Sequence, residues 1–152
     1  MVALERALPD AAATAALAAR LAPRAVPGDV VALRGVLGSG KTSFARGFIA
    51  ARAGRALEVP SPTFTLVQTY DLPDGTIWHF DLYRLERPDD AVELGIDEAF
   101  AAGISLIEWP ERLGGLLPAA RLDLELAFAG TGRRAVLTPH DGWRARLADL
   151  AA

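Results

Sequence analysis

The pattern of apolar and polar residues predicts a strand, a loop and a helix in the first third of the chain. Residues 30–33 are all apolar, which is typical of a short strand buried on both faces. Residues 35–42 are rich in glycine and predict a loop, and residues 43–53 place aromatic and aliphatic side chains on one side of a helix. A helix is also predicted over residues 10–21, with Asp10 placed to cap its amino end.

The middle of the chain changes period and predicts a β-hairpin. Residues 63–70 and 77–83 are rich in β-branched and aromatic side chains, and residues 71–75 between them carry strong turn chemistry. The later pattern predicts, in order, a helix, a short helix, a buried strand, a strand with one wetter face, a further strand and a terminal helix, over residues 88–95, 96–102, 104–107, 121–128, 134–138 and 143–150.

Length and composition exclude several classes of protein for this chain. The chain has 152 residues, 51% of them hydrophobic, which is enough for one domain with a continuous core. The formal net charge of −3 argues against a protein that binds nucleic acid by itself, and the absence of cysteine excludes disulfides and thiolate metal sites. No apolar stretch is long enough to span a bilayer, and residues 1–9 lack the pattern of a signal peptide. We therefore expect a cytoplasmic protein with no membrane association.

A glycine-rich motif carries the clearest chemistry. Residues 35–42, Gly-Val-Leu-Gly-Ser-Gly-Lys-Thr, match the phosphate-loop pattern in full, between a predicted strand and a predicted helix. Glycines let the backbone curl so that successive N–H groups face an anion, and the helix adds the partial positive charge of its amino end. Lys41, the only lysine of the chain, would neutralise the β- and γ-phosphates, and the Thr42 hydroxyl would take one position on magnesium. The motif predicts binding of a nucleoside triphosphate.

The motif and the order of the elements together predict the fold class. We expect an α/β protein with a P-loop NTPase fold, in which three α/β/α layers surround a mainly parallel central sheet that also carries antiparallel hairpin strands. The whole chain, residues 1–152, is expected to form a single P-loop ATPase domain.

Two acidic residues end predicted strands and are candidates for the carboxylate that a phosphate loop needs. Asp81 follows the apolar run that ends at Phe80, and Glu108 follows residues 104–107. Each could complete the magnesium shell or orient water, and the alternative for each taken alone is a solvated strand end. His79 shares a strand face with Asp81 and is either a proton carrier or, more commonly, a hydrogen-bonded structural histidine.

Three further positions each keep two interpretations. Trp109 is either an aromatic residue that binds a partner or gates the substrate, or a core tryptophan. Arg133, beside Arg134, supplies a cation to the nucleotide or belongs to a solvated pair after a turn. Residues 61–63 form a nucleotide-sensing segment or a plain connecting turn.

With these pieces in order, the chain resembles the bacterial TsaE family, the small ATPases of tRNA threonylcarbamoyladenosine biosynthesis. The resemblance spans nearly the whole chain. Its motifs are residues 35–42, 61–64 (Ser-Pro-Thr-Phe), 79–84 (His-Phe-Asp-Leu-Tyr-Arg), 94–95 (Leu-Gly) and 107–111 (Ile-Glu-Trp-Pro-Glu). The first motif alone is generic to a large superfamily, whereas the combination in this order is specific.

The resemblance implies roles for individual residues. Catalytic residues would be Lys41, Asp81 and Glu108, and the metal would be held by Thr42 and Glu108. The nucleotide would be bound by the loop and by residues from both ends of the chain, namely Leu37, Gly38, Ser39, Gly40, Lys41, Thr42, Ser43, Asp10, Thr14, Glu111 and Arg133. Switch or partner contacts would come from Ser61, Thr63 and Trp109.

Two loop residues depart from the family pattern. Val36 stands where an acidic residue is usual, and Ser39 stands where alanine is common. Neither position contributes side-chain chemistry to the loop, so nucleotide binding is expected to survive both departures.

The resemblance also implies a supporting function with ATP and Mg²⁺. TsaE-like proteins bind a TsaD–TsaB pair and hydrolyse ATP, slowly when alone and faster with the pair, so that the modification of tRNA can turn over repeatedly. The tRNA would be contacted only through these partners, which agrees with the acidic net charge. The alternatives are a small-molecule P-loop kinase and a nucleotide-dependent interaction module that does not hydrolyse ATP.

Overall fold

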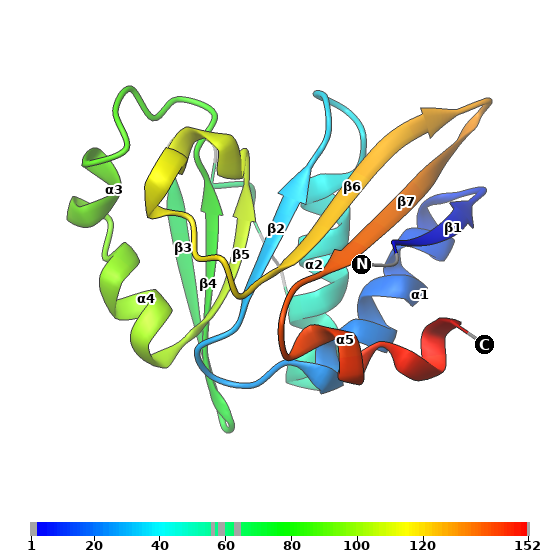
Figure 1. The fold of residues 1–152 in the computed structure, drawn as a ribbon, viewed down its shortest axis with the longest axis horizontal. Coiled ribbons are helices and arrows are strands. Elements are labelled where there is room, and N and C mark those ends of the chain that lie inside the picture. The colour runs from blue at the N-terminus through cyan, green and yellow to red at the C-terminus, as the bar shows by residue number, and fades with distance from the viewer. Residues whose placement is uncertain (1–2, 56, 58–59, 63–64, 152) are drawn as a thin grey trace.

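The computed structural model describes residues 3–55, 57, 60–62 and 65–151, and these residues build one seven-stranded sheet (Figure 1). The strands lie in the order β1-β7-β6-β2-β5-β4-β3. Their bounds are Leu4–Leu8 (β1), Val30–Arg34 (β2), Val67–Leu72 (β3), Gly75–Asp81 (β4), Ile104–Glu108 (β5), Leu122–Ala129 (β6) and Gly132–Pro139 (β7). The α/β class predicted from the sequence is confirmed, and the predicted hairpin is the pair β3–β4.

The sheet is mixed, so the prediction of a mainly parallel sheet was wrong. Parallel pairing joins β2 to β5, β2 to β6 and β4 to β5, whereas β1 with β7, β6 with β7 and β3 with β4 are antiparallel. Strands joined by a short turn pair antiparallel, because a parallel neighbour requires a long crossover. The short turns explain the antiparallel pairs β3–β4 and β6–β7. Strand β1, which the sequence did not predict, adds a further antiparallel pair with β7, so both edges of the sheet are antiparallel.

Helices lie on both faces of the sheet. Their bounds are Ala11–Leu21 (α1), Lys41–Ala53 (α2), Asp90–Glu93 (α3), Ile96–Ala102 (α4) and Trp143–Arg146 (α5), with 3₁₀ turns at Ala22–Arg24 (η1), Pro110–Leu116 (η2) and Ala148–Ala151 (η3). The Asp10 carboxylate caps α1 as predicted, because its Oδ1 accepts a 2.8 Å hydrogen bond from the Ala13 amide. Helix α2 begins at Lys41, two residues earlier than the hydrophobic pattern predicted.

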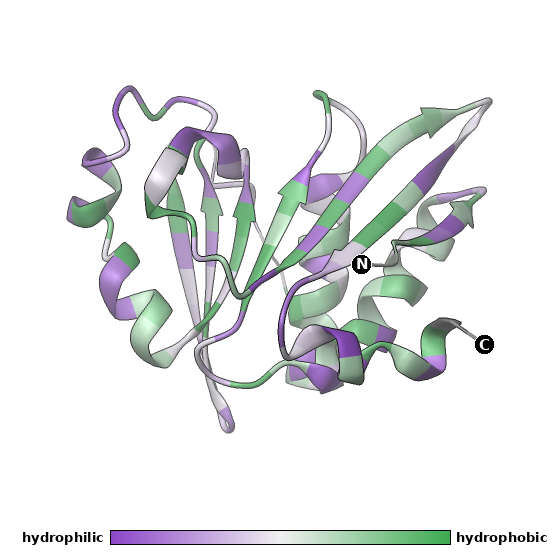
Figure 2. Ribbon diagram, viewed as in Figure 1, coloured by the Kyte–Doolittle hydropathy of each residue, from purple (hydrophilic) through white to green (hydrophobic). Residues whose placement is uncertain are grey.

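Two sets of buried side chains hold these layers together. One face of the sheet packs against α1, α2 and the C-terminal segment through residues such as Phe44, Phe48 and Trp143. The other face packs against α3, α4 and η2 through residues such as Phe80 and Ile107. Figure 2 shows the consequence in sequence terms: β5, covered on both faces, is hydrophobic over most of its length, whereas β6 alternates between hydrophobic and hydrophilic residues.

Among the described residues, no helix has both the length and the hydrophobicity that crossing a bilayer requires.

Candidate functional site

Glycines shape the phosphate loop between β2 and α2. Gly35 has φ 144°, and a Cβ at this position would lie 2.5 Å from the carbonyl oxygen of Leu126 on β6. Gly40 has φ 107° in the left-handed region and is the N-cap of α2. L-residues with side chains rarely adopt these angles, so only glycine lets β2 turn sharply enough for the helix to start at Lys41. The first N–H groups of α2, which have no carbonyl partner within the helix, therefore begin at the loop.

Lys41 is held against the loop by three contacts. Its Nζ donates to the carbonyl oxygens of Gly35 (2.6 Å) and Val36 (3.1 Å) and lies 4.2 Å from the centre of the Trp109 ring. Only 5% of the residue is exposed. Burial lowers the pKa of Lys41 from its usual value, and the negative charges of Glu108, Asp81 and Glu111 oppose that shift. The ammonium is therefore bound to the loop backbone and lies near three carboxylates.

Asp81 and Glu108 lie side by side at the ends of β4 and β5. The two residues are register partners on parallel neighbouring strands, so their side chains leave the same face of the sheet. They are 6% and 3% exposed, which is unusual for carboxylates. Asp81 Oδ1 accepts a 3.1 Å hydrogen bond from the Tyr83 amide. Both carboxylates are buried and line a cavity with residues of the loop, so neither is a solvated strand end; that both face a nucleotide stays a prediction.

Glu108 joins the loop helix to the sheet through two side chains. The Thr42 hydroxyl lies 2.9 Å from Oε1 and 3.1 Å from Oε2 of Glu108. From the other side, His79 Nε2 on β4 lies 2.6 Å from Oε2. Thr42 and Glu108 therefore present adjacent oxygen ligands of the kind that Mg²⁺ prefers. No group of three or more His, Cys, Asp or Glu side chains suited to a metal occurs in the described part of the chain.

A cavity of about 260 Å³ collects these groups. The residues around it are Leu37, Gly38, Gly40, Lys41, Thr42, Ser43, Asp81, Glu108 and Trp109. Trp109 has φ 59°, uncommon for a residue with a side chain, and its ring packs 5.0 Å from the Tyr83 ring while it covers Lys41. Trp109 thus lines the cavity and, partly buried, also packs against the core on that face of the sheet.

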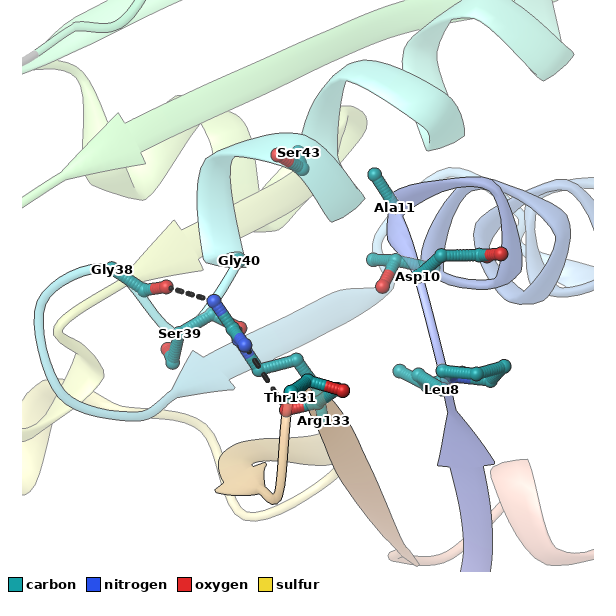
Figure 3. A pocket seen from close by; sticks show the side chains of 12 residues that line it. Leu8, Asp10, Ala11, Gly38, Ser39, Gly40, Ser43, Thr131 and Arg133 are labelled. Carbon is teal, nitrogen blue, oxygen red and sulfur yellow. Dashed lines mark hydrogen bonds between the residues drawn. The ribbon is translucent and has the colours of Figure 1, made fainter.

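A second cavity of about 230 Å³ also borders the loop (Figure 3). Gly38, Ser39, Gly40 and Ser43 form one wall, and the end of β1 and the start of α1, with Asp10 and Thr14, form another. Arg133 reaches in from β7 and donates to the carbonyl oxygens of Gly38 (3.0 Å) and Ser39 (3.2 Å). Residues that the sequence placed loosely, Asp10, Thr14 and Arg133, are therefore brought together at the loop.

The remaining predicted residues are Glu111, Ser61 and Thr63, and the two that the structure describes, Glu111 and Ser61, line neither cavity. Glu111 is exposed on η2 and acts on Lys41 through its charge, without lining either cavity. Ser61 is exposed, and Thr63 lies outside the described residues. The segment that holds Ser61 leads to Leu66, whose carbonyl oxygen accepts from the Asp81 amide at 3.0 Å, so it ends beside the carboxylates.

Two features of the site were missed from the sequence. The cavity in Figure 3 includes Leu8, Thr131 and Gly132, which reach the loop only because β1 and β6 flank β7 in the sheet. The His79–Glu108 contact depends on β4 and β5 being neighbours in a particular register. A single sequence carries no signal for either pairing.

Comparison with known proteins identifies the family. Residues 8–136 match the family described as threonylcarbamoyl adenosine biosynthesis protein TsaE. The chain therefore belongs to the TsaE family. The resemblance stated from the sequence motifs is thus confirmed, and every residue that lines the cavity of Lys41 and Glu108 falls within the matched range.

Individual TsaE proteins are similar over most of the chain. The tRNA threonylcarbamoyladenosine biosynthesis protein TsaE of Rickettsia bellii is 43% identical over 108 residues, which cover 71% of this chain and 75% of the relative. The protein of the same name from Bacillus subtilis is 41% identical over 126 residues, which cover 81% of this chain and 77% of the relative. The crystal structure of YdiB from Bacillus subtilis matches with a TM-score of 0.82 at 31% identity, over 99% of this chain and 94% of YdiB.

Proposed function

We propose that this member of the TsaE family is a P-loop NTPase that binds ATP with Mg²⁺ and hydrolyses it. The observation that carries the proposal is the 260 Å³ cavity, where the loop and the amino end of α2 meet a buried lysine, a hydroxyl and two buried carboxylates. Backbone N–H groups and an ammonium suit the charge of a triphosphate, and the oxygen ligands suit its metal.

Lys41 and the loop would bind the phosphates. The ammonium is already held at the loop by the carbonyl oxygens of Gly35 and Val36, so it need not be ordered on binding. Thr42 and Glu108 would hold Mg²⁺, which neutralises charge on the β- and γ-phosphates when bound. The oxygens of these two residues lie 2.9 Å apart, close enough to be neighbouring ligands of one ion.

Asp81 would orient the attacking water. Its bond from the Tyr83 amide fixes the carboxylate at the strand end, beside Glu108. In the reaction the water oxygen bonds to the γ-phosphorus, the bond from that phosphorus to the β–γ bridging oxygen breaks, and a water proton passes to the Asp81 carboxylate. The products are ADP and phosphate.

The cavity of about 230 Å³ would take the nucleoside. It shares Gly38, Gly40 and Ser43 with the first cavity, so one ligand could extend from one cavity into the other. Asp10 and Arg133 supply an acceptor and a donor at its walls, which suits a nucleobase edge or a ribose.

We propose that hydrolysis serves tRNA threonylcarbamoyladenosine biosynthesis in the cytoplasm through a TsaD–TsaB pair. The names of the relatives support the pathway. The net charge of −3 supports contact with tRNA through partners rather than directly. Trp109 lines the cavity beside Glu108, and Ser61 and Thr63 precede β3 in the chain; these residues are proposed to contact the partner pair, and such contacts would raise the slow rate of the isolated protein.

The test is release of phosphate from ATP with Mg²⁺, with and without the TsaD–TsaB pair. Lys41→Ala and Glu108→Ala should each lower the stimulated rate about 100-fold or more, because Lys41 would neutralise charge on the phosphates and Glu108 would hold the Mg²⁺ that does the same. Glu98→Ala, which removes an exposed carboxylate on α4, is the matched control and should leave the rate unchanged. Retention of the stimulated rate by both site variants would refute the site assignment.

Two other outcomes would replace the proposal. Transfer of the γ-phosphate to a small acceptor instead of water would identify a kinase. Binding of ATP without release of phosphate, even with the partner pair present, would identify a nucleotide-dependent interaction module.

A further inference from the structure

His79 is a fully buried polar side chain beside the proposed metal ligand. It lies on β4 two residues before Asp81, so the two side chains leave the same face of the sheet, the face covered by α2. Phe80 between them packs into the opposite core. None of the surface of His79 is exposed, and its Nε2 lies 2.6 Å from Oε2 of Glu108.

The direction of this hydrogen bond follows from its partner. An ionised carboxylate only accepts hydrogen bonds, so Nε2 of His79 carries the hydrogen and donates it. The other ring nitrogen, Nδ1, has no partner among the described residues. The ring is therefore held by one polar contact, and that contact is to Glu108. An apolar side chain of similar size could fill the same place in the core without leaving a ring nitrogen unpaired.

The bond restricts the orientation of the Glu108 carboxylate. His79 fixes Oε2 from within the sheet, whereas Thr42 approaches both oxygens from the loop helix. Both His79 and Glu108 lie on hydrogen-bonded neighbouring strands, so the distance between their backbones is set by the sheet. The carboxylate is thus held from a rigid element while its loop-facing side remains directed at Thr42.

We propose that His79 is a positioning residue that orients the Glu108 carboxylate for Mg²⁺. The inference rests on the proposed function, because it concerns the metal that Thr42 and Glu108 would hold there. Residues that hydrogen-bond to metal ligands typically change metal affinity or activity 10- to 100-fold when they are replaced. His79 does not touch the substrate in this proposal and acts only through Glu108.

The test compares two replacements that differ in reach. His79→Gln keeps an N–H donor as many bonds from the backbone as Nε2, and His79→Asn brings its donor one bond short. In His79→Asn, the gain in ATP affinity that Mg²⁺ produces should be smaller by about 10-fold or more, and kcat should be lower by about 10-fold or more. Its affinity for ATP without Mg²⁺ should stay within about twofold of the parent, and His79→Gln should recover most of both losses.

His140→Asn is the matched control. His140 Nε2 also pairs with a carboxylate, Asp123 Oδ2 at 2.9 Å, but neither residue lines the cavity of Lys41 and Glu108. The control should bind Mg²⁺ and ATP as the parent does. His79→Asn behaving like His140→Asn would overturn the inference, as would equal losses in His79→Asn and His79→Gln, which would indicate a structural role alone.

A spectroscopic measurement tests the contact without relying on turnover. In protein labelled with ¹⁵N-histidine, the Nε2–H of His79 should give an exchangeable proton resonance far downfield, assigned by its absence in His79→Gln. It should be lost in Glu108→Gln and should shift when Mg²⁺ and a non-hydrolysable ATP analogue are added. A resonance that is unchanged in Glu108→Gln would overturn the inference. Failure of the parent to bind the analogue with Mg²⁺ would instead refute the proposed function.

Discussion

Replacing Gly35 with alanine tests whether close backbone approach shapes the phosphate loop. A Cβ at Gly35 would lie 2.5 Å from the Leu126 carbonyl oxygen and 2.5 Å from Ser39 Oγ, and the φ of 144° is itself unfavourable for alanine. The strained backbone costs about 1–3 kcal/mol, and relieving the overlap costs about 1–3 kcal/mol more. Because Leu126 contributes backbone from β6, the clash cannot be relieved by a side-chain rotation alone.

The sum of these terms, about 2–6 kcal/mol, is a large fraction of the stability of a domain this size. A loss of 1 kcal/mol lowers Tm by about 2–4 °C at this length, so Gly35→Ala should lower Tm by roughly 4–24 °C. Thermal and urea unfolding followed by circular dichroism measure the change. The variant should also lose affinity for a fluorescent ATP analogue, because the loop must move away from β6.

Gly54→Ala separates the two contributions. Gly54 has φ 72° at the end of α2, and a Cβ there would meet nothing within 4 Å, so only backbone strain of about 1–2 kcal/mol is expected. If Gly35→Ala destabilises the protein no more than Gly54→Ala does, the close approach to β6 does not determine the shape of the loop.

Three further results are expected. Burial lowers the pKa of Lys41 below its usual 10.5, so the unfolded chain binds more protons at Lys41 than the folded protein does, and the parent gains stability as the pH rises through the lowered pKa. Any stability advantage of Lys41→Met over the parent, measured by urea unfolding, should therefore shrink as the pH rises toward 10.5. Arg133→Ala removes two donors to the loop carbonyls and should weaken binding of a fluorescent ATP analogue by about tenfold, whereas Arg134→Ala, which replaces its exposed neighbour, should not. Trp109→Phe should remove most of the change in tryptophan fluorescence on ATP binding, because Trp78 and Trp143 do not line that cavity, and a change as large as in the parent would show that the nucleotide does not bind beside Trp109.

The two local patterns that predicted the site, the strand–loop–helix unit and the β-hairpin, both form in the structure. The strand, glycine loop and helix over residues 30–53 form as predicted because the glycines, the apolar run and the amphipathic helix agree with one another. The hairpin also forms, although β3 begins at Val67 rather than at residue 63, and residues 63–64 lie outside the described part. The turn residues predict where the two strands connect, but they do not predict where each strand begins or ends.

What the sequence did not predict depends on distant pairing. Residues 4–8, Leu-Glu-Arg-Ala-Leu, favour a helix by composition, yet they form β1 because β7 offers an edge with which they pair over all five positions. That pairing carries the chain to Asp10, which then lies beside the loop. The 3₁₀ turn η2 was missed for a related reason: the left-handed backbone at Trp109 ends β5 and redirects the chain at a residue that carries no turn signal.

The in-register pairing of Asp81 and Glu108 separates two kinds of motion. Adjacent strands are spaced about 4.8 Å apart by their hydrogen bonds, and changing that spacing would require breaking the ladder itself. The acid pair should therefore keep its geometry, whereas the glycines before Lys41 and the residue Trp109 lie outside the strands and are not held by that ladder. If the proposed partners control the site, they would then act on the phosphate loop and Trp109, while Asp81 and Glu108 keep their positions.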